Sequence, residues 1–497
     1  MDRHKTMLEY LNGYTRAEQA SFHMPGHKGY DFFEREGYGD IFKRFPDYDI
    51  TEIAGADNLF KPRGIIKKLM KRYSRYYHAE KSYLLINGSS SGIVAAIMAT
   101  IKPGEKLIMD RSSHKSAVNG IALAGGVPVY IYPESVVEYG ITGEMTAEEV
   151  EKALEKNPDA KAVFITSPNY YGICSDIEAI SEVVHSKGKI LIVDQAHGAH
   201  LKGFYDTGRL PFGVKDAERS GADIVVNSIH KTMASFTQTA VINICTGTVS
   251  GGKIRDALQM VESSSPSYLM MLSMEMNMEI CERRGRKLAD EWLDMLSKFR
   301  EEAKDIKGLQ IVNHSKLDPS KLNLDMSSCG ITGKELSVML MERGIYTELH
   351  RGGICLAMTG IGNRWEDYQI LLNALKDISR KAEKSNSKIC EKDVLGTKET
   401  FANPLLDEKN IESENQQIAH NFGSSFSKDW EKVHFSFAVG RISARPIIPY
   451  PPGIPLIVGG QVIDRKVLEE ALALMESGCS VMGIDKKGFV YCYKENY

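Results

Sequence analysis

Asp194 and Lys231 each follow a short apolar run of the sequence. Asp194 comes directly after residues 189–193, and Lys231 lies shortly after residues 223–226. A carboxylate at the end of a buried strand is costly unless a cation faces it. A lysine in a partly dry pocket can lose its proton and become nucleophilic. The two residues therefore indicate a reactive amine close to a carboxylate that needs a positively charged partner.

Residues near two other apolar runs could bind an anion and a flat ring. The segment 87–92, Asn-Gly-Ser-Ser-Ser-Gly, precedes an apolar helical stretch, so its backbone N–H groups and hydroxyls could surround a phosphate. Its hydroxyls belong to Ser89, Ser90 and Ser91. His114 follows the run at 106–109, where its imidazole could stack on a ring. Plain helix caps or a surface histidine would explain these features equally well when each is taken singly.

Three more polar residues lie beside the carboxylate and the lysine. His197 follows Asp194 closely, and Ser228 and His230 alternate just before Lys231, where both could reach a phosphate. Taken alone, the aspartate could be a helix cap and the lysine could be solvated. Together, the four strand ends offer a phosphate cradle, a ring stacker, a partner for a ring nitrogen and an amine for a Schiff base. Those are the groups needed to hold pyridoxal phosphate (PLP) and use it as an electron sink.

Short apolar runs that alternate with helical patterns must position these groups. The expected strands are residues 82–86, 106–109, 127–132, 162–166, 190–193 and 223–226. Runs this short and continuous are typical of strands buried on both faces. Helical patterns such as 92–101 and 177–186 separate several of them. The sequence therefore predicts an α/β fold, a mainly parallel sheet with helices on both faces, which binds ligands at the carboxyl ends of its strands.

The chain has 497 residues, too many for one ordinary domain. We expect an irregular N-terminal arm at 1–60 and a large PLP-binding domain at 61–306. A small α/β domain at 307–381, a polar linker at 382–432 and a C-terminal domain at 433–497 would follow.

Composition argues against several classes of partner. The net charge is −3, without the concentrated basic patch that a nucleic-acid surface needs. No signal-peptide core is visible, and no run approaches the ~18 apolar residues of a membrane span. The eight cysteines form no CxxC pair, which is typical of free thiols in a reducing compartment. We expect a cytoplasmic protein without metal, membrane or nucleic-acid partners.

The order of these motifs resembles that of the fold-type I PLP enzymes and, more closely, the Orn/Lys/Arg decarboxylase family. The matching stretches are FHMPGHKG at 22–29, DQAHGAH at 194–200, SIHKT at 228–232, TQTA at 237–240, SSSPSYL at 263–269 and PYPPGIPL at 449–456. The resemblance implies an aspartate aminotransferase-like fold and decarboxylation of a basic amino acid to an amine, as in polyamine biosynthesis. Arginine is the first expectation, followed by lysine or ornithine. It also implies the short form, without an N-terminal wing domain.

The resemblance further implies a role for each residue. Lys231 would bind the cofactor aldehyde covalently, and Asp194 would hydrogen-bond its ring nitrogen. His114 would stack on the ring, and His197 would lie near the ring hydroxyl or the substrate carboxylate. With Lys231 and Asp194, His197 would complete the catalytic set. The phosphate ligands would come from Ser89, Ser90, Ser91, Ser228 and His230. The family also implies a homodimer with shared sites, in which Ser265 and Ser267 act across the interface.

Several positions depart from the family pattern, and one of them is Phe435-Ser436, where the family has an acidic pair. Asn58, Gln195 and Gln461 are neutral where the family usually has a carboxylate. A basic substrate needs carboxylates to receive it, so these changes favour a less usual amino acid or an altered activity. Two alternatives stay open. One is another fold-type I reaction, such as transamination or lyase chemistry, with Arg351 or Arg364 holding the substrate carboxylate. The other is a PLP-binding protein without activity.

Overall fold

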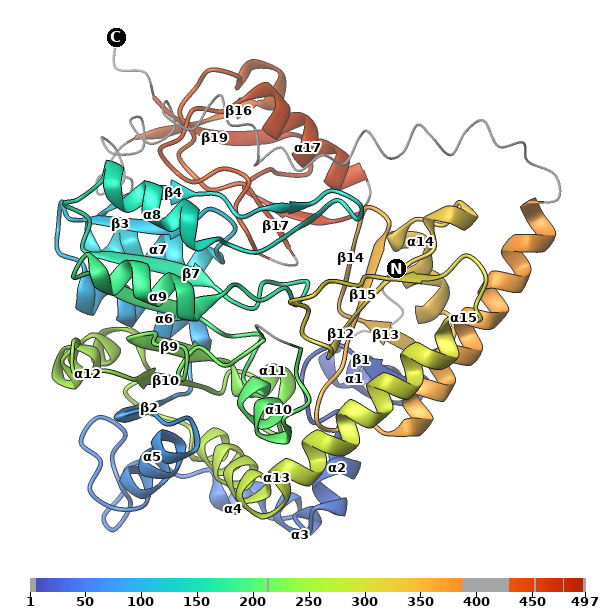
Figure 1. Ribbon diagram of the computed structural model, residues 1–497, viewed down its shortest axis with the longest axis horizontal. Coiled ribbons are helices and arrows are strands. Elements are labelled where there is room, and N and C mark those ends of the chain that lie inside the picture. Colours follow the sequence, from blue (N-terminus) through green and yellow to red (C-terminus); the bar gives the residue numbers. More distant parts are fainter. Residues whose placement is uncertain (1–5, 212–213, 387–428, 451–452, 477, 495–497) are drawn as a thin grey trace.

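A seven-stranded sheet forms the centre of the molecule (Figure 1). The computed structural model describes residues 6–211, 214–386, 429–450, 453–476 and 478–494. In spatial order, the strands are β2 (Lys81–Leu85), β10 (Ala240–Ile244), β9 (Ile224–Asn227), β8 (Ile190–Asp194), β7 (Ala162–Thr166), β3 (Lys106–Asp110) and β4 (Val127–Ile131). Pairing is parallel except at β10, which runs antiparallel to β2 and β9. The predicted α/β fold with a mainly parallel sheet is confirmed, although β10 was not predicted.

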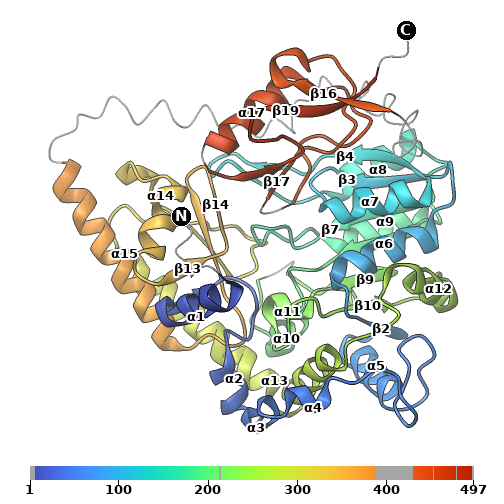
Figure 2. The same cartoon turned by 180° about the vertical axis from the view of Figure 1, so that it is seen from behind.

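Helices bury both faces of this sheet (Figures 1 and 2). Successive side chains of a strand point to opposite faces. Phe164 of β7 therefore packs in the core formed with α6 (Gly88–Thr100), α7 (Lys115–Ala124) and α12 (Gly251–Val261). Its neighbour Val163 packs toward α8 (Ala147–Lys156) and α9 (Ile177–Ser186). Burial on both faces explains why the strands are continuous apolar runs.

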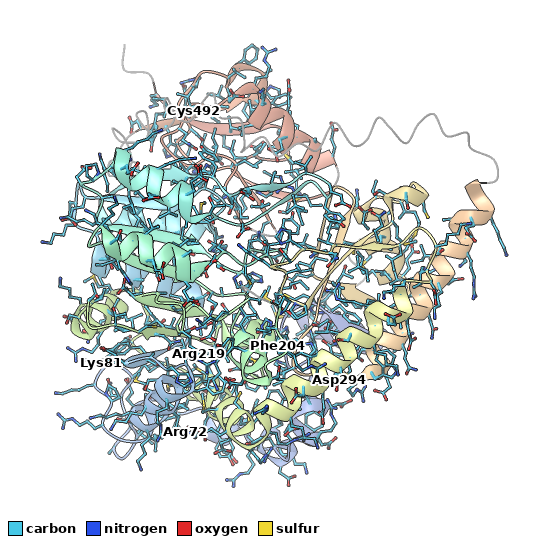
Figure 3. The ribbon with its side chains drawn as sticks, viewed as in Figure 1. Arg72, Lys81, Phe204, Arg219, Asp294 and Cys492 are labelled. Carbon is cyan, nitrogen blue, oxygen red and sulfur yellow. The ribbon has the colours of Figure 1, made fainter. Side chains whose placement is uncertain are left out.

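A smaller four-stranded sheet lies beside the first, and the long helix α13 (Tyr268–Ala303) extends from below the large sheet to the side of the smaller one, next to α15 (Trp365–Asn386), as Figure 1 shows. The strands of the smaller sheet are β11 (Gln310–Ile311), β12 (Lys321–Asp325), β15 (Ile354–Met358) and β14 (Leu349–Arg351), with helices α14 (Gly333–Met341) and α15. Phe204, labelled in Figure 3, belongs to α10 (Leu201–Thr207). Its ring contacts that of Trp292 of α13, with ring centroids 4.7 Å apart. This aromatic contact ties the large sheet's helices to α13.

The N-terminal arm is more regular than predicted. It contains α1 (Met7–Ala17), β1 (Ala20–Phe22), α2 (Tyr30–Arg35), α3 (Gly39–Phe42) and α4 (Phe45–Tyr48), and α5 (Ile65–Tyr76) follows it. The helix α1 begins with a capping box between Thr6 and Glu9, a signal that the apolar pattern alone does not carry. The strand β1 pairs with β13 (Ile345–Thr347) of the small-domain segment, and residues this far apart in sequence give no local sign of pairing.

The remaining described elements are short or belong to the C-terminal segment. They are β5 (Ser135–Val136), β6 (Ile141–Thr142), α11 (Ile229–Thr232), the 3₁₀ helices Ser327–Cys329 and Phe435–Phe437, β16 (Trp430–His434), β17 (Ile448–Tyr450), α17 (Arg465–Glu476), β18 (Ser480–Met482) and β19 (Phe489–Tyr493). Within the predicted linker at 382–432, α15 continues to Asn386 and β16 begins at Trp430. Residues 387–428 lie outside the described part. The domain boundaries otherwise stay predictions.

Arg111 attaches the C-terminal segment to the large sheet. It follows β3, and its two terminal nitrogens donate to the carbonyls of Pro455 and Leu456 at 2.7 and 2.8 Å. Its guanidinium also lies over the ring of Tyr130, 5.3 Å from the centroid. Charged donors of this kind stabilise a contact by about 1.5–3 kcal/mol each.

We predict that Arg111→Met loosens this attachment. The free energy of unfolding should fall by about 2–4 kcal/mol, because two buried carbonyls lose charged donors. Hydrogen exchange should accelerate around residues 453–461. Arg255→Met is the matched control, since its side chain is 48% exposed, and it should change neither measurement. Equal exchange in both variants would contradict the prediction.

Candidate active site

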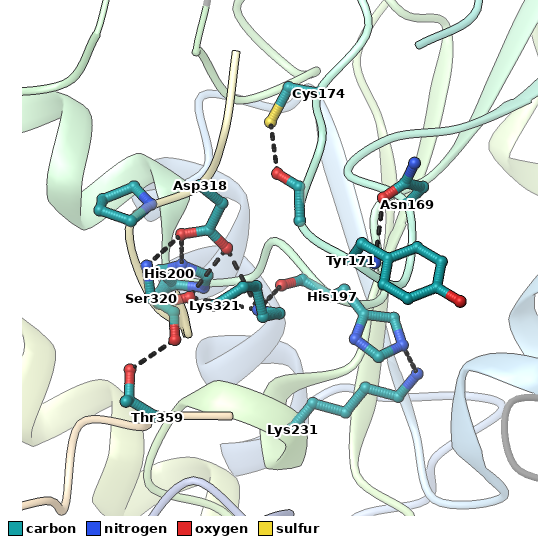
Figure 4. Close-up of polar contacts among 12 residues, drawn as sticks. Asn169, Tyr171, Cys174, His197, His200, Lys231, Asp318, Ser320, Lys321 and Thr359 are labelled. Carbon is teal, nitrogen blue, oxygen red and sulfur yellow. Dashed lines mark hydrogen bonds and ion pairs between the residues drawn. The ribbon is translucent and has the colours of Figure 1, made fainter. Parts of the chain in front are cut away.

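Lys231 and His197 meet at the carboxyl edge of the large sheet (Figure 4). Asp194 ends β8 and pairs in register with Val226 of the parallel neighbour β9, so the segments after both strands leave the sheet side by side. His197 lies in the segment after β8, and Lys231 lies in α11 after β9. The Nζ of Lys231 is 2.9 Å from the Nε2 of His197. The structure therefore brings together the amine and imidazole that the sequence indicated.

Asp194 is a buried carboxylate beside this pair. Its side chain accepts a hydrogen bond from the backbone N–H of Ala196 at 3.0 Å. Burial raises the pKa of Asp194 above its usual value, and the positive charge of Lys231 opposes that rise. A second cation placed next to this carboxylate would stabilise its charged form further.

Burial also acts on the amine and the imidazole. It lowers the pKa of Lys231, while the negative charges of Asp194 and Glu348 raise it. It lowers the pKa of His197 well below the usual value, and the charge of Lys231 lowers it further. A neutral imidazole can accept a hydrogen bond from the Lys231 amine at Nε2, and its own proton is then at Nδ1. That buried Nδ1 has no hydrogen-bond partner among the residues that the structure describes.

Ser89 and Ser228 form the centre of the predicted phosphate cradle. The Oγ of Ser228 donates to the Oγ of Ser89 at 2.8 Å, which joins the end of β9 to the first turn of α6. Ser90 lies in the same turn. Ser91 behaves differently, since its buried hydroxyl donates to the carboxylate of Glu262. The geometry thus brings together the hydroxyls of Ser89 and Ser228, while Ser90 is an exposed residue of the same turn.

The two remaining histidines also lie close to the lysine. His230 has its Nδ1 2.9 Å from the carbonyl of Thr239, and burial lowers its pKa to about 4. His114 caps α7 because its Nδ1 accepts from the backbone N–H of Ser116 at 3.2 Å, and the Oγ of Ser116 is 2.8 Å from the same nitrogen. Burial lowers the pKa of His114 to about 3, and the charge of Lys231 contributes. The capping role considered from the sequence is therefore present, together with proximity to Lys231.

Glu348 is a site residue that sequence reasoning missed. It lies between β13 and β14, and its carboxylate accepts from the Met24 backbone N–H at 2.9 Å and the Tyr170 hydroxyl at 2.8 Å. The Tyr170 ring lies 4.5 Å from the His197 ring, centroid to centroid. Glu348 thus joins the arm and the small-domain segment to the group formed by Lys231, His197 and Asp194. No local pattern marks it, because each of its partners is distant in the sequence.

Comparison with known proteins agrees with this geometry. The family models Orn/Lys/Arg decarboxylase, major domain, and Orn/Lys/Arg decarboxylase, C-terminal domain, match residues 6–323 and 408–481. The chain is 30% identical to the arginine decarboxylase of Bacillus subtilis (strain 168), covering 97% of this chain and 96% of that protein. It is 31% identical to the arginine decarboxylase of Halalkalibacterium halodurans, covering 94% and 93%. This chain belongs to the Orn/Lys/Arg decarboxylase family. It is a decarboxylase that uses PLP, as the motifs predicted.

Solved structures of decarboxylases have the same fold. The chain superposes on the lysine decarboxylase of Francisella novicida with a TM-score of 0.71 at 20% identity, covering 97% of this chain and 80% of that one. Lysine decarboxylase A of Pseudomonas aeruginosa gives 0.70, also at 20% identity, with 98% and 80% covered. At this identity the likeness shows the fold alone, that of fold-type I PLP enzymes. Among the described residues, no helix is long and apolar enough to cross a membrane.

The site residues fit the family's cofactor. The desolvated carboxylate of Asp194 suits a protonated ring nitrogen, and the unpartnered Nδ1 of His197 can donate to an oxygen of the ring. The hydroxyls of Ser89 and Ser228 at the start of α6 suit a phosphate.

The three neutral departures from the decarboxylase family pattern have local structural roles. Gln195 donates from Nε2 to Glu218 at 2.8 Å and accepts from a backbone N–H at Oε1. Asn58 donates to Glu52 at 2.7 Å. Gln461 accepts a backbone N–H from its own segment at 2.9 Å. Within the described chain, the side chains of these three residues form these local hydrogen bonds. Their neutrality therefore does not determine the charge around Lys231.

The arginines considered for transamination lie elsewhere. Arg351 pairs with Glu470 of α17 at 2.9 Å and so joins the small-domain segment to the C-terminal segment. The side chain of Arg364 is exposed. Neither geometry supports an arginine that holds the substrate carboxylate in an aminotransferase reaction.

We predict that Gly26→Ala disturbs the site through the backbone. A Cβ at Gly26 would lie 2.2 Å from the carbonyl carbon of Thr232, directly after Lys231. Overpacking against backbone costs about 1–3 kcal/mol. Thermal unfolding should show this loss, and bound PLP per chain should fall. Gly247→Ala, whose Cβ would meet its nearest neighbour at 3.9 Å, should change neither. Unchanged cofactor content in Gly26→Ala would refute the prediction.

We also predict that Gln195→Glu destabilises the protein in a pH-dependent way. Burial raises the pKa of Glu218 from 4.5 to about 7, so its neutrality stabilises the fold at low pH, and this contribution is lost as pH rises toward 7. A second carboxylate beside it would raise the pKa of the pair further. Relative to the wild type, the variant should therefore lose more unfolding free energy at pH 8 than at pH 5, by about 1–3 kcal/mol. Urea titrations measure this, with exposed Gln310→Glu as control.

Proposed function

We propose that this protein decarboxylates a basic amino acid, arginine first and then lysine or ornithine, to an amine and carbon dioxide. The observation that carries the proposal is the 2.9 Å contact between Lys231 and His197, next to the buried carboxylate of Asp194. The relatives named arginine decarboxylase, which align over nearly the whole chain, support arginine as the first substrate to test.

PLP, when bound, supplies an aldehyde for covalent attachment and a protonated ring that withdraws electrons as carbon dioxide leaves. Lys231 supplies the amine for attachment. Asp194 would hold the proton at the ring nitrogen, which would keep the ring an effective electron acceptor. His114 would pack against the ring, and the Nδ1 proton of His197 would serve the ring hydroxyl or the substrate carboxylate.

The phosphate would be held at the start of α6. Ser89, Ser90 and Ser228 offer hydroxyls there, and Ser91 contributes by its place in the turn, since its hydroxyl is committed to Glu262. An anion beside His230 would raise the pKa of that imidazole and draw a proton to its Nε2.

A proton must reach the α-carbon after carbon dioxide leaves. Lys231 is suited to deliver it because burial lowers its pKa, so it both gains and releases a proton readily. His197, in hydrogen-bond contact with Lys231, can pass the proton on or orient the amine. The carboxylate of Glu348 keeps the small-domain side of the site negative, which favours a cationic substrate over an acidic one.

The assembly and location are part of the same proposal. A homodimer with shared sites would explain why Ser265 lies exposed beside the N-terminus of α13, which Ser267 caps. A partner subunit could reach both residues. The cytoplasmic location, a role in polyamine biosynthesis, and the absence of metal and nucleic-acid partners stay predictions.

We predict that Lys231→Ala abolishes covalent cofactor attachment. After borohydride reduction, mass spectrometry should find PLP on Lys231 of the wild type and on no residue of the variant. Release of labelled carbon dioxide from arginine should fall by on the order of 10³-fold or more. Lys304→Ala, whose side chain is 68% exposed, is the control. Labelling of another lysine in the wild type would overturn the site. Carbon dioxide from acidic amino acids, but from no basic one, would overturn the substrate class.

A further inference from the structure

A buried ion cluster lies next to His197, on the side of its backbone carbonyl (Figure 4). The Nε2 of His200 is 3.0 Å from an oxygen of Asp318, and the Nζ of Lys321 is 3.1 Å from the other oxygen. The exposed fractions of these side chains are 1%, 0% and 0%. Burying charges costs several kcal/mol per ion, so a fully enclosed lysine needs well-placed partners. None of the steps proposed for the reaction uses these residues.

The ammonium of Lys321 has a partner for each of its three protons. It donates to Asp318, to Ser320 Oγ at 3.2 Å, and to the backbone carbonyl of His197 at 3.3 Å. Asp318 is itself fixed by the backbone N–H and the hydroxyl of Ser320, at 2.9 and 2.8 Å. The lysine is therefore held in one position, and one of its three bonds ends on the residue that contacts Lys231.

The cluster also joins segments that are distant in the sequence. Lys321 begins β12 of the smaller sheet, whereas His197 and His200 lie in the segment between β8 and α10 of the larger one. A Cβ at Gly172 would lie 2.5 Å from the Cγ of Lys321, so the segment after β7 packs on the lysine stem as well. That segment carries Tyr170, whose ring contacts the His197 ring.

We propose that Lys321, anchored by Asp318 and His200, is a positioning residue that fixes the His197 backbone and so aims its imidazole at Lys231. The inference rests on the proposed role of His197 in the reaction. Because Lys321 holds the backbone carbonyl of His197, it fixes the position from which the imidazole extends. Misplacement of a reacting group by 1 Å can lower the rate of a reaction about 10²-fold.

The charge of Lys321 also acts on His197. The imidazole faces the cations Lys231 and Lys321 and the rings of His114 and His230, all of which oppose its protonation. Removing the positive charge of Lys321 therefore raises the pKa of His197. Protonated His197 cannot accept a hydrogen bond from the Lys231 amine. Because its raised pKa makes this protonation occur at higher pH, the acidic limb of the pH–rate profile should move to higher pH.

Lys321→Met in the full-length holoenzyme tests the inference. It should lower kcat about 10²-fold with little change in KM, and should shift the acidic limb of kcat upward by at least ~0.5 pH unit. The matched control is Arg300→Met. Arg300 is another cation, largely buried, that donates to the carbonyls of Pro319 and Lys321 at 3.2 Å each and, among the described residues, makes no hydrogen bond to His197. Arg300→Met should lower the unfolding temperature while leaving the pH profile in place.

A purely structural role would give a different result. If Lys321→Met loses stability like Arg300→Met but keeps the wild-type kcat and acidic limb, the inference is overturned. If Lys321→Met does not fold, the double variant Asp318→Asn with Lys321→Met takes its place in the same measurements. This double variant removes both charges of the ion pair, so neither is left buried without a partner.

A second readout separates this inference from the proposed function. In the cofactor-free protein with carbon-13-labelled histidine, the His197 resonance, assigned through His197→Gln, should titrate at higher pH in Lys321→Met than in the wild type. Wild-type protein that decarboxylates no amino acid would overturn the proposed function alone, because the titration would still report on Lys321. An unchanged titration of His197 would overturn the positioning role even if the enzyme is active.

Discussion

The electrostatic attraction between the buried carboxylate of Asp194 and the partly buried amine of Lys231 is the constraint on which the rest of this structure depends. Both residues stand at the carboxyl edge of the sheet, where burial disfavours either charge and the opposite charge of the other residue offsets part of that cost. Parallel pairing of β8 and β9 places both segments there. Helices on both faces of the sheet then keep the edge dry, and this dryness is what lowers the pKa of the amine and makes it reactive.

The charges around the amine come from two separate parts of the chain. Asp194 belongs to the large sheet, whereas Glu348 and Lys321, the first residue of β12, belong to the small-domain segment. The arm contributes the Met24 backbone N–H that fixes Glu348. The electrostatic state of Lys231 is therefore established only when these parts are docked together. Folding and the preparation of the site are one event rather than two.

The sequence predicted the strand ends well and the contacts between distant segments poorly. Continuous apolar runs reveal strands that are buried on both faces, which is why Asp194 and Lys231 could be placed at the ends of two strands. The strand β10 was not predicted because its apolar run is interrupted by Asn243. This buried polar residue forms side-chain hydrogen bonds with Ser82 and Glu218. Glu348 and Lys321 gain their importance only from partners far away in the chain. The departures at positions 58, 195 and 461 suggested a changed substrate because a sequence does not show which way a side chain points.

The close approach of Gly453 to His114 has a consequence for shortened forms of this protein. A Cβ at Gly453 would lie 3.0 Å from the His114 Nε2, and the Gly453 carbonyl accepts from the Lys115 backbone N–H at 3.0 Å. The C-terminal segment therefore covers the imidazole of His114. A chain that ended after α15 would keep Lys231, His197 and Asp194 but would lose this cover, together with the partners of Arg111 and Arg351 in the C-terminal segment. Water would then reach His114 from that side, and the vitamin-derived group would be less well shielded although no catalytic side chain had changed.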